Sequence, residues 1–124
     1  MTAVLLVGVG AAVGAPLRYL ADRMVQSRHD SVFPWGTFTV NVVASVLLGA
    51  ITAASVHGGV SIPVVALVGP GFCGALSTYS TYSYETFRLV EEGSWFLAGC
   101  NVVVSVAAGL GGAALGWRIG LTLR

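Results

Sequence analysis

The sequence predicts an all-α membrane protein, a single domain over residues 1–124 that crosses the bilayer four times. Hydrophobic residues make up 56% of the chain and charged residues only 9%, whereas soluble domains carry about 25% charged residues. Four windows are apolar for about the 20 residues that a helix needs to span a membrane. The 17 glycines are typical of closely packed membrane helices. A net charge of +1 gives no basic field, so we expect no nucleic-acid partner.

The predicted spans cover about residues 3–20, 35–55, 61–87 and 94–119. No basic residue precedes the first span, so it is not expected to be a removable signal peptide. Arg23, Arg28 and Arg88 lie in the first and third loops, which favours a cytoplasmic location of those loops. The bias is small, because Arg118 and Arg124 lie on the other side. Such a chain could insert both ways, and two oppositely inserted copies could pair.

Small residues recur at four-residue spacing in the first and fourth spans, as Gly10 with Gly14 and Gly112 with Gly116. Such pairs let helix backbones approach closely, which drives helix association in lipid. Two interpretations stay open. Packing within one chain explains most pairs of this kind, and contact between two chains is the alternative.

Polar side chains recur every four residues along two spans. The second span carries Thr37, Asn41, Ser45 and then Gly49, and the fourth carries Asn101, Ser105 and then Gly109. Residues four apart share one face of a helix, and a polar group at membrane depth needs a partner. An interhelical hydrogen bond, worth about 1 kcal/mol, explains a single stripe. Two stripes in one small chain make a shared polar pathway an equal alternative.

The third span contains a predicted break, because three glycines surround Pro70 between residues 69 and 74. Proline removes a backbone hydrogen bond, and each glycine costs a helix about 1 kcal/mol. Ser77 or Thr78 could then cap a second half-helix. Carbonyl groups freed at a break form a cation site. A simple kink is the alternative.

Hydroxyl groups occur at almost every position after the break. The candidate pore residues in this stretch are Tyr79, Ser80, Thr81, Tyr82 and Ser83. The edges of aromatic rings carry partial positive charge. Ring edges, hydroxyls and amides can hold an anion without a full opposite charge, which lets the anion leave again. The pathway therefore suits an anion or a neutral solute better than a cation.

These motifs resemble those of the Fluc/CrcB family of fluoride ion channels, along nearly the whole chain. Residues 10–19, GAAVGAPLRY, resemble the family's GGxxGAxxRY, with Ala11 in place of the second glycine. Residues 35–41 resemble its GTxxVN motif. Residues 71–85, GFCGALSTYSTYSYE, resemble its GFxGxxTTFSTFSxE. The last motif is long and specific.

The resemblance implies an antiparallel, dual-topology homodimer with two fluoride pores, in the lipid of a prokaryotic plasma membrane. It implies a structural Na⁺ at the dimer centre, held by the backbone carbonyls of Gly74 and Ser77. Asn41 would donate to fluoride, and Tyr79 and Tyr82 would take the places of two pore-facing phenylalanines.

Three further residues follow from the same resemblance. Ser105 and Asn101 match polar positions of the family's fourth helix, and Arg18 would lie near a vestibule. The implied function is passive export of cytoplasmic fluoride, which lowers the toxicity of the ion. The two tyrosines depart from the family pattern, so pairing with a paralogous subunit in a heterodimer stays open.

Two other functions were weighed against a channel. A small proton-coupled multidrug exporter needs an acidic residue inside a span, usually the first, and none of the five acidic residues lies in the middle of that span. A non-conducting assembly subunit leaves the polar stripes without a purpose. We do not expect an enzyme, because His29 and His57 lie in different loops with no nucleophile or carboxylate pair beside them.

Overall fold

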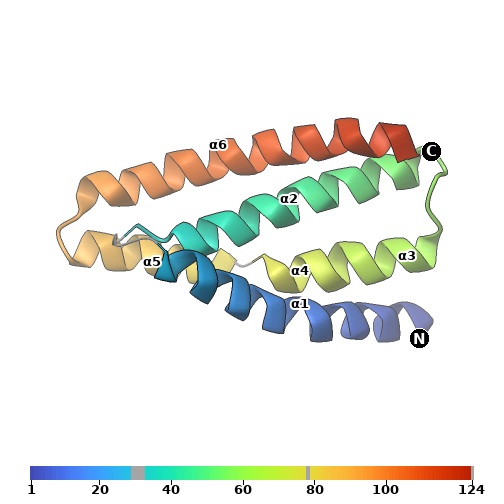
Figure 1. Cartoon of the computed structure of the whole chain (residues 1–124), viewed down its shortest axis with the longest axis horizontal. Coiled ribbons are helices and arrows are strands. Elements are labelled where there is room, and N and C mark those ends of the chain that lie inside the picture. The colour runs from blue at the N-terminus through green and yellow to red at the C-terminus, as the bar shows by residue number, and fades with distance from the viewer. Residues whose placement is uncertain (29–32, 78, 124) are drawn as a thin grey trace.

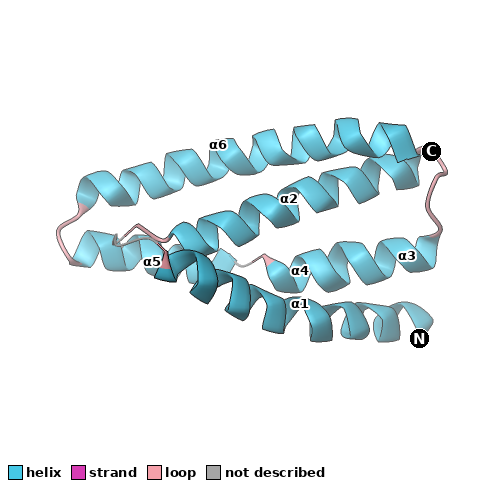
Figure 2. Cartoon of the chain, viewed as in Figure 1, coloured by secondary structure: helices cyan, strands magenta, loops and turns pink. Residues whose placement is uncertain are grey.

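The computed structural model describes residues 1–28, 33–77 and 79–123, except for the side chains of residues 79, 80 and 123. Within these ranges the chain forms helices and loops and contains no strand (Figures 1 and 2). Helices α1 (Thr2–Ser27), α2 (Trp35–Val56) and α6 (Trp95–Gly120) are each long and apolar enough to cross a membrane, as is the stretch Ile62–Glu91. The structure confirms four membrane-capable spans.

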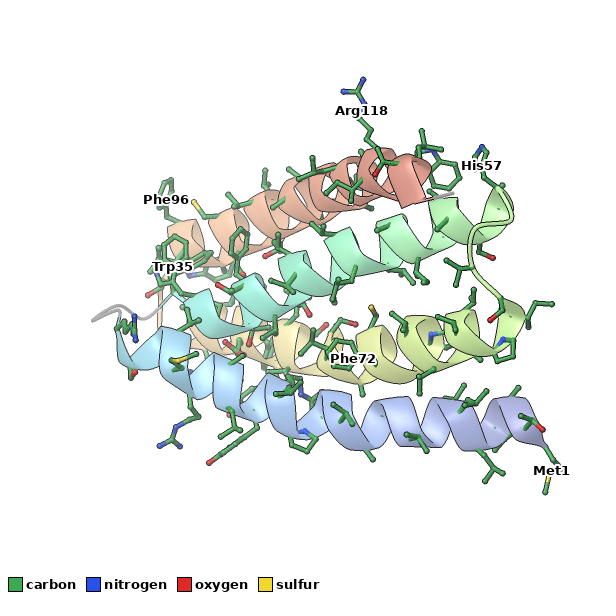
Figure 3. All side chains as sticks on the ribbon, turned by 45° about the vertical axis from the view of Figure 1, so that its right-hand side comes forward. Met1, Trp35, His57, Phe72, Phe96 and Arg118 are labelled. Carbon is green, nitrogen blue, oxygen red and sulfur yellow. The ribbon has the colours of Figure 1, made fainter. Side chains whose placement is uncertain are left out.

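The four spans run along a common axis, with both chain termini at one end of the bundle (Figure 1). At this end α2 ends and α3 (Ile62–Ala66) begins. At the other end lie the last residue of α1, the first residue of α2, and the connection from α5 (Tyr79–Glu91) to α6. Figure 3 shows Met1 and His57 at the first end and Trp35 and Phe96 at the second. An even number of crossings requires this arrangement of termini.

The first helix is longer than the expected span, because it continues past residue 20 to Ser27. Residues 21–27 contain no glycine or proline and include good helix formers such as Met24 and Gln26. Gln26 also attaches this end to the start of α2. Its Nε2 donates to the carbonyl of Phe33 at 3.3 Å, and its Oε1 accepts from the amide of Gly36 at 3.2 Å. The apolar window therefore ends before the helix does.

The third span changes its helical geometry around Pro70. It consists of α3 (Ile62–Ala66), η1 (Leu67–Cys73), α4 (Gly74–Leu76) and α5 (Tyr79–Glu91). The η1 segment is a π-helix, in which the amide of Gly74 donates to the carbonyl of Gly69, five residues earlier. Because Pro70 has no N–H, a wider turn satisfies the remaining backbone groups at this point.

The glycine-rich residues 69–74, where the sequence predicts the break, are thus helical. The backbone is extended at Ser77 instead, with φ −79° and ψ 157°, directly after the end of α4. Residue 78 lies outside the described residues, so its expected capping role is not placed. The broken third helix stays a prediction.

Glycines let neighbouring helices pack with their backbones in contact. A Cβ atom at Gly116 of α6 would collide with the carbonyl oxygen of Val46 and lie 3.0 Å from the amide nitrogen of Ala50, both on α2. A Cβ atom at Gly14 of α1 would lie 2.6 Å from the carbonyl oxygen of Phe72 in η1. Both GxxxG pairs therefore contribute to packing within the chain.

The small core lies between α2 and the third span. It contains Val40, Ala44, Cys73 and Leu76, all of them buried. Many large apolar side chains elsewhere face outward, and the exposed fraction is 70% at Leu110 and 81% at Phe96. This inside-out distribution suits a protein whose outer surface contacts lipid.

Candidate functional site

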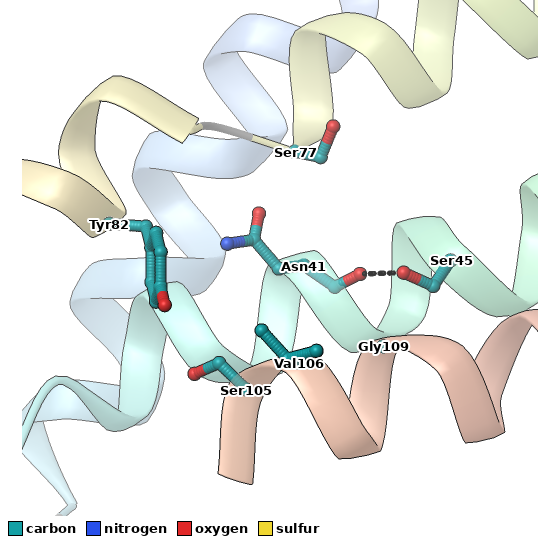
Figure 4. A pocket seen from close by; sticks show the side chains of 7 residues that line it. All are labelled: Asn41, Ser45, Ser77, Tyr82, Ser105, Val106 and Gly109. Carbon is teal, nitrogen blue, oxygen red and sulfur yellow. Dashed lines mark hydrogen bonds between the residues drawn. The ribbon is translucent and has the colours of Figure 1, made fainter. Parts of the chain in front are cut away.

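An uncharged polar cavity lies between α2, α6 and the two segments on either side of residue 78. Its volume is about 310 Å³, and its described lining residues are Asn41, Ser45, Ser77, Tyr82, Ser105, Val106 and Gly109. Figure 4 shows the side chain of Asn41 pointing into the space between Tyr82 and Ser77. None of these lining residues is acidic or basic.

Helical spacing places the polar groups of this cavity at similar depths. Asn41 and Ser45 are one turn apart on α2, and Ser105 and Gly109 are one turn apart on α6. A Cβ atom at Gly109 would lie 3.7 Å from the Oγ of Ser45. The absence of a side chain at Gly109 therefore leaves open space between the two helices.

The three serine hydroxyls of the cavity all donate to protein acceptors. The Ser45 hydroxyl donates to the carbonyl of Asn41 at 2.8 Å, and the Ser77 hydroxyl to the carbonyl of Cys73 at 2.8 Å. The Ser105 hydroxyl donates to the side-chain oxygen of Asn101 at 3.1 Å. Each hydroxyl has one proton, so in this arrangement the serines turn lone pairs rather than protons toward the cavity.

A second cavity adjoins the first through the shared residues Ser45 and Ser77. Its volume is about 340 Å³, and its described lining residues are Ala44, Ser45, Leu48, Gly69, Pro70, Cys73, Gly74 and Ser77. Gly74 and Ser77 stand at the C-terminal end of a helix, where carbonyl groups lack helical partners and carry partial negative charge. Carbonyl oxygens of this kind fit a hard monovalent cation. The described residues contain no cluster of three or more His, Cys, Asp or Glu side chains, so backbone oxygens are the donors that this place offers.

Charged groups gather nearer the end of the bundle where α2 begins. One cavity of about 170 Å³ is lined by Arg18, Tyr19, Asp22, Thr37, Val40 and Thr81. Another, of about 360 Å³, is lined by Asp22, Gln26, Pro34, Thr81, Tyr84, Glu85 and Arg88. The two share Asp22 and Thr81. They form a polar approach from that end of the bundle.

One hydrogen bond joins α2 to α5 (Tyr79–Glu91) within this charged region. The hydroxyl of Thr37, whose exposed fraction is 3%, donates to Oε1 of Glu85 at 2.5 Å. Thr37 lies one turn before Asn41 on α2, so the same helix face carries both groups.

The structure brings several of the expected site residues together and leaves others apart. Asn41, Tyr82 and Ser105 line the uncharged cavity, with Ser77. Arg18 and Thr81 line the charged region. Gly74 lines the second cavity but not the first. The assignment of these residues to a pore or a cation site stays a prediction.

Two expected residues whose side chains are described, Asn101 and Ser83, do not line these cavities. Asn101 is 1% exposed and lies behind the uncharged cavity, where its Nδ2 donates to Oγ1 of Thr86 at 2.6 Å. Ser83 is half-buried on α5. The side chains of Tyr79 and Ser80 lie outside the described residues.

The sequence analysis did not single out Thr86 or the pairing of Thr37 with Glu85. Thr86 follows Tyr82 by one helical turn, a spacing that places a hydroxyl against the carbonyl of Tyr82, and the two are 2.8 Å apart. The motif of residues 71–85 ends at Glu85 but predicts no partner for its carboxylate. A carboxylate at the end of an apolar span needs a donor, and Thr37 provides it.

Comparison with known proteins gives a consistent result over most of the chain. Residues 5–117 match the model of a family described as CrcB-like protein, Camphor Resistance (CrcB). The chain is 63% identical to the fluoride-specific ion channel FluC 1 of Frankia casuarinae, over 90% of this chain and 91% of that protein. It is 59% identical to the fluoride-specific ion channel FluC 1 of Streptomyces avermitilis, over 90% of each chain. It is 44% identical to the fluoride-specific ion channel FluC of Shewanella frigidimarina, over 86% of each chain.

Proposed function

Because the chain belongs to the CrcB family, we propose that it is a passive, fluoride-selective channel that exports fluoride from the cytoplasm and lowers its toxicity. The observation that carries this proposal is the uncharged cavity, which the Asn41 amide and the Tyr82 ring line together at membrane depth. The proposal is also supported by similar proteins that are named fluoride-specific ion channels. No catalytic step is needed for this role.

Conduction requires a site that an anion enters and leaves without a large free-energy change. The two N–H groups of Asn41 and the ring edge of Tyr82 supply partial positive charge. Neither supplies a full opposite charge that would trap the ion. Arg18, in the charged region, attracts anions to the approach. The negative cell interior then drives an anion outward with about 2.3 kcal/mol per 100 mV.

The logic of a passive pore follows from the chemistry of hydrogen fluoride. The uncharged acid crosses membranes and dissociates in a more alkaline cytoplasm, where the anion is trapped. A channel that lets the anion follow the membrane potential removes it without an energy source. A bacterial plasma membrane is the location that this role requires.

The proposed assembly is an antiparallel homodimer. The cavity formed by one chain opens at the bundle surface, and a second copy would complete its wall in the membrane. Where the two copies meet, the carbonyls of Gly74 and Ser77 would hold a structural Na⁺. The ion would neutralise the partial negative charge of four helix-end carbonyls. A heterodimer with a paralogous subunit is the alternative.

The test of the function is a fluoride efflux assay on the purified chain in liposomes. We expect release of trapped fluoride when a K⁺ ionophore dissipates the membrane potential, with trapped chloride retained. Protein-free liposomes provide the baseline. Fluoride retention equal to that baseline in a sample of pure, folded chain would contradict the homodimeric channel, and recovery of efflux on adding a paralogous subunit would point to the heterodimer.

Substitutions of Tyr82 separate the contribution of its ring from that of its hydroxyl. We expect fluoride flux through Tyr82→Phe to remain within about threefold of the parent, since phenylalanine keeps the ring edge. Tyr82→Leu loses an interaction that is worth about 0.5–1.5 kcal/mol, so its flux should fall up to about tenfold. Efflux from liposomes with equal amounts of protein measures both.

Tyr84 offers a matched control for that pair of variants. It lies two residues after Tyr82 on α5, is 63% exposed and does not line the uncharged cavity. Tyr84→Leu should reduce the flux less than Tyr82→Leu does, because Tyr84 lines the charged region and not the uncharged cavity. If Tyr82→Leu behaves like Tyr84→Leu, the ring of Tyr82 does not contact the ion.

A further inference from the structure

A chain of hydrogen bonds runs behind the uncharged cavity, from α5 to α6, and ends at the cavity wall. It begins at the backbone carbonyl of Tyr82, which accepts from the hydroxyl of Thr86 at 2.8 Å. Asn101 Nδ2 donates to Oγ1 of Thr86 at 2.6 Å. The hydroxyl of Ser105, which lines the cavity, donates to Oδ1 of Asn101 at 3.1 Å. The residue at the middle, Asn101, is 1% exposed.

The direction of every bond in this chain follows from its first member. A carbonyl only accepts, so Thr86 must donate its single proton to Tyr82. The Thr86 oxygen then has only lone pairs left for Asn101, which requires that the NH₂ of Asn101 faces Thr86. The amide oxygen of Asn101 consequently faces Ser105. The hydroxyl of Ser105 must therefore donate its one proton to Oδ1 of Asn101.

This fixed direction determines what Ser105 presents to a solute in the cavity. With its proton directed at Asn101, the serine oxygen turns lone pairs toward the open space, and lone pairs repel an anion. To donate to an anion, Ser105 would have to break its hydrogen bond to Asn101. That would leave a buried amide oxygen without a donor, which is unfavourable.

We propose that Asn101 is a positioning residue that keeps the Ser105 hydroxyl from donating to the permeating ion, and so keeps this part of the pathway a weak anion site. The proposal rests on the proposed channel function and refines it. Asn101 does not touch the ion. It acts through the proton of Ser105, and Thr86 fixes the orientation of Asn101.

For conduction, this means that the permeating anion stays only briefly beside Ser105. Anion affinity would be concentrated on the Asn41 amide and the Tyr82 ring, which lie across the cavity from α6 (Figure 4). An additional strong donor at Ser105 would hold the ion longer, and release from a site that binds too well limits conduction.

Three single variants and one double variant test the proposal through the fluoride concentration at half-maximal flux. Asn101→Leu removes the acceptor, so Ser105 becomes able to donate to the ion. We expect the half-saturating concentration to fall about threefold to tenfold, as one added hydrogen bond implies, with a lower maximal flux. Ser105→Ala should not lower the half-saturating concentration, because no hydroxyl remains at this position to donate to the ion. The double variant Asn101→Leu/Ser105→Ala should behave like Ser105→Ala.

Thr86→Val reaches the same state without altering Asn101. Without the Thr86 oxygen, the Asn101 amide can turn its NH₂ toward Ser105. The Ser105 oxygen then accepts this hydrogen bond, and its own O–H can point into the cavity and donate to the ion. We expect the same fall in half-saturating concentration as for Asn101→Leu. Thr39→Val is the matched control, since the Thr39 hydroxyl donates only to the Trp35 carbonyl of its own helix, at 2.8 Å.

A side-chain amide measurement is independent of flux. The sequence contains one glutamine and two asparagines, so ¹⁵N spectra of the folded chain in detergent should show few pairs of side-chain NH₂ signals. The pair that disappears in Asn101→Leu belongs to Asn101. We expect the NH₂ protons of Asn101 to be protected from exchange with solvent in the parent and in Ser105→Ala. In Thr86→Val their signals should shift or lose this protection.

The outcomes separate the proposal from the channel function. A parent chain that carries no fluoride contradicts the function, and the amide spectra still decide the direction of the hydrogen bonds. The proposal is overturned if the NH₂ protons of Asn101 exchange freely with solvent in the parent, or if Thr86→Val leaves their signals unchanged. It is also overturned by a shift in half-saturating concentration by Asn101→Leu that persists in the Ser105→Ala background, because Asn101 would then act on structure rather than through Ser105.

Discussion

Fluoride efflux through the Asn41→Asp variant is expected to fall below about 1% of the parent rate. The two side chains have nearly the same shape, but aspartate replaces two N–H donors by an oxygen and adds a negative charge. Two like charges about 4 Å apart repel by roughly 4 kcal/mol at an effective dielectric constant of 20. That free energy corresponds to about a thousandfold lower occupancy by an anion. The liposome efflux assay measures the change directly.

Ser45→Ala provides the control one turn further along the same helix. Ser45 lines the same cavity, but its proton is directed at the carbonyl of Asn41. Its removal should leave flux within about threefold of the parent. An Asn41→Asp variant that folds and conducts within tenfold of the parent would exclude Asn41 from the ion pathway.

Gly116→Ala is expected to destabilise the folded chain by about 1–3 kcal/mol, the range found when an atom is added to a closely packed site. The added methyl group would collide with the Val46 carbonyl and would also lie 2.7 Å from the carbonyl carbon of that residue. The neighbouring atoms are backbone, so α2 and α6 must move apart. Thermal unfolding in detergent, followed by the loss of monodisperse protein, measures the effect.

Gly111→Ala is the matched control in the same helix. A Cβ atom at Gly111 would meet nothing within 4 Å. Alanine is also the better helix former by about 1 kcal/mol, so this variant should be as stable as the parent or more stable. Equal melting temperatures for the two variants would show that the contact between α2 and α6 is looser than the structure indicates.

The fold was predictable from sequence where hydrophobicity alone determines it. Each apolar window became a membrane-capable helix, and even the connection order follows from counting crossings. The end of α1 was not predictable in this way, because residues 21–27 contain two charged side chains and Gln26, yet they remain helical. Gln26 packs against the start of α2. The π-helix at Pro70 also required the structure, since composition shows that a backbone bond is lost but not how the helix compensates.

The candidate site was predictable at the level of residue type and helix face. The four-residue spacing on two helices indicated Asn41 and Ser105, and both line one cavity. The same spacing predicted that Asn101 and Ser105 would both face the pathway. In the structure Ser105 lines the cavity, whereas Asn101 is buried behind the cavity wall. Periodicity gives the face of a helix but not the neighbour that covers it. The contact of Asn101 with Thr86 depends on how α5 and α6 dock, which one sequence does not reveal.

The position of both termini at one end of the bundle restricts how two copies can ever be joined genetically. In the antiparallel pair proposed above, the last residue of one copy and the first residue of the other lie on opposite faces of the bilayer. A flexible soluble linker in a tandem fusion would therefore force the two halves into the same orientation. A working single-chain version needs an odd number of extra membrane crossings between the halves, and one apolar helix of about 20 residues is the shortest sequence that meets this condition.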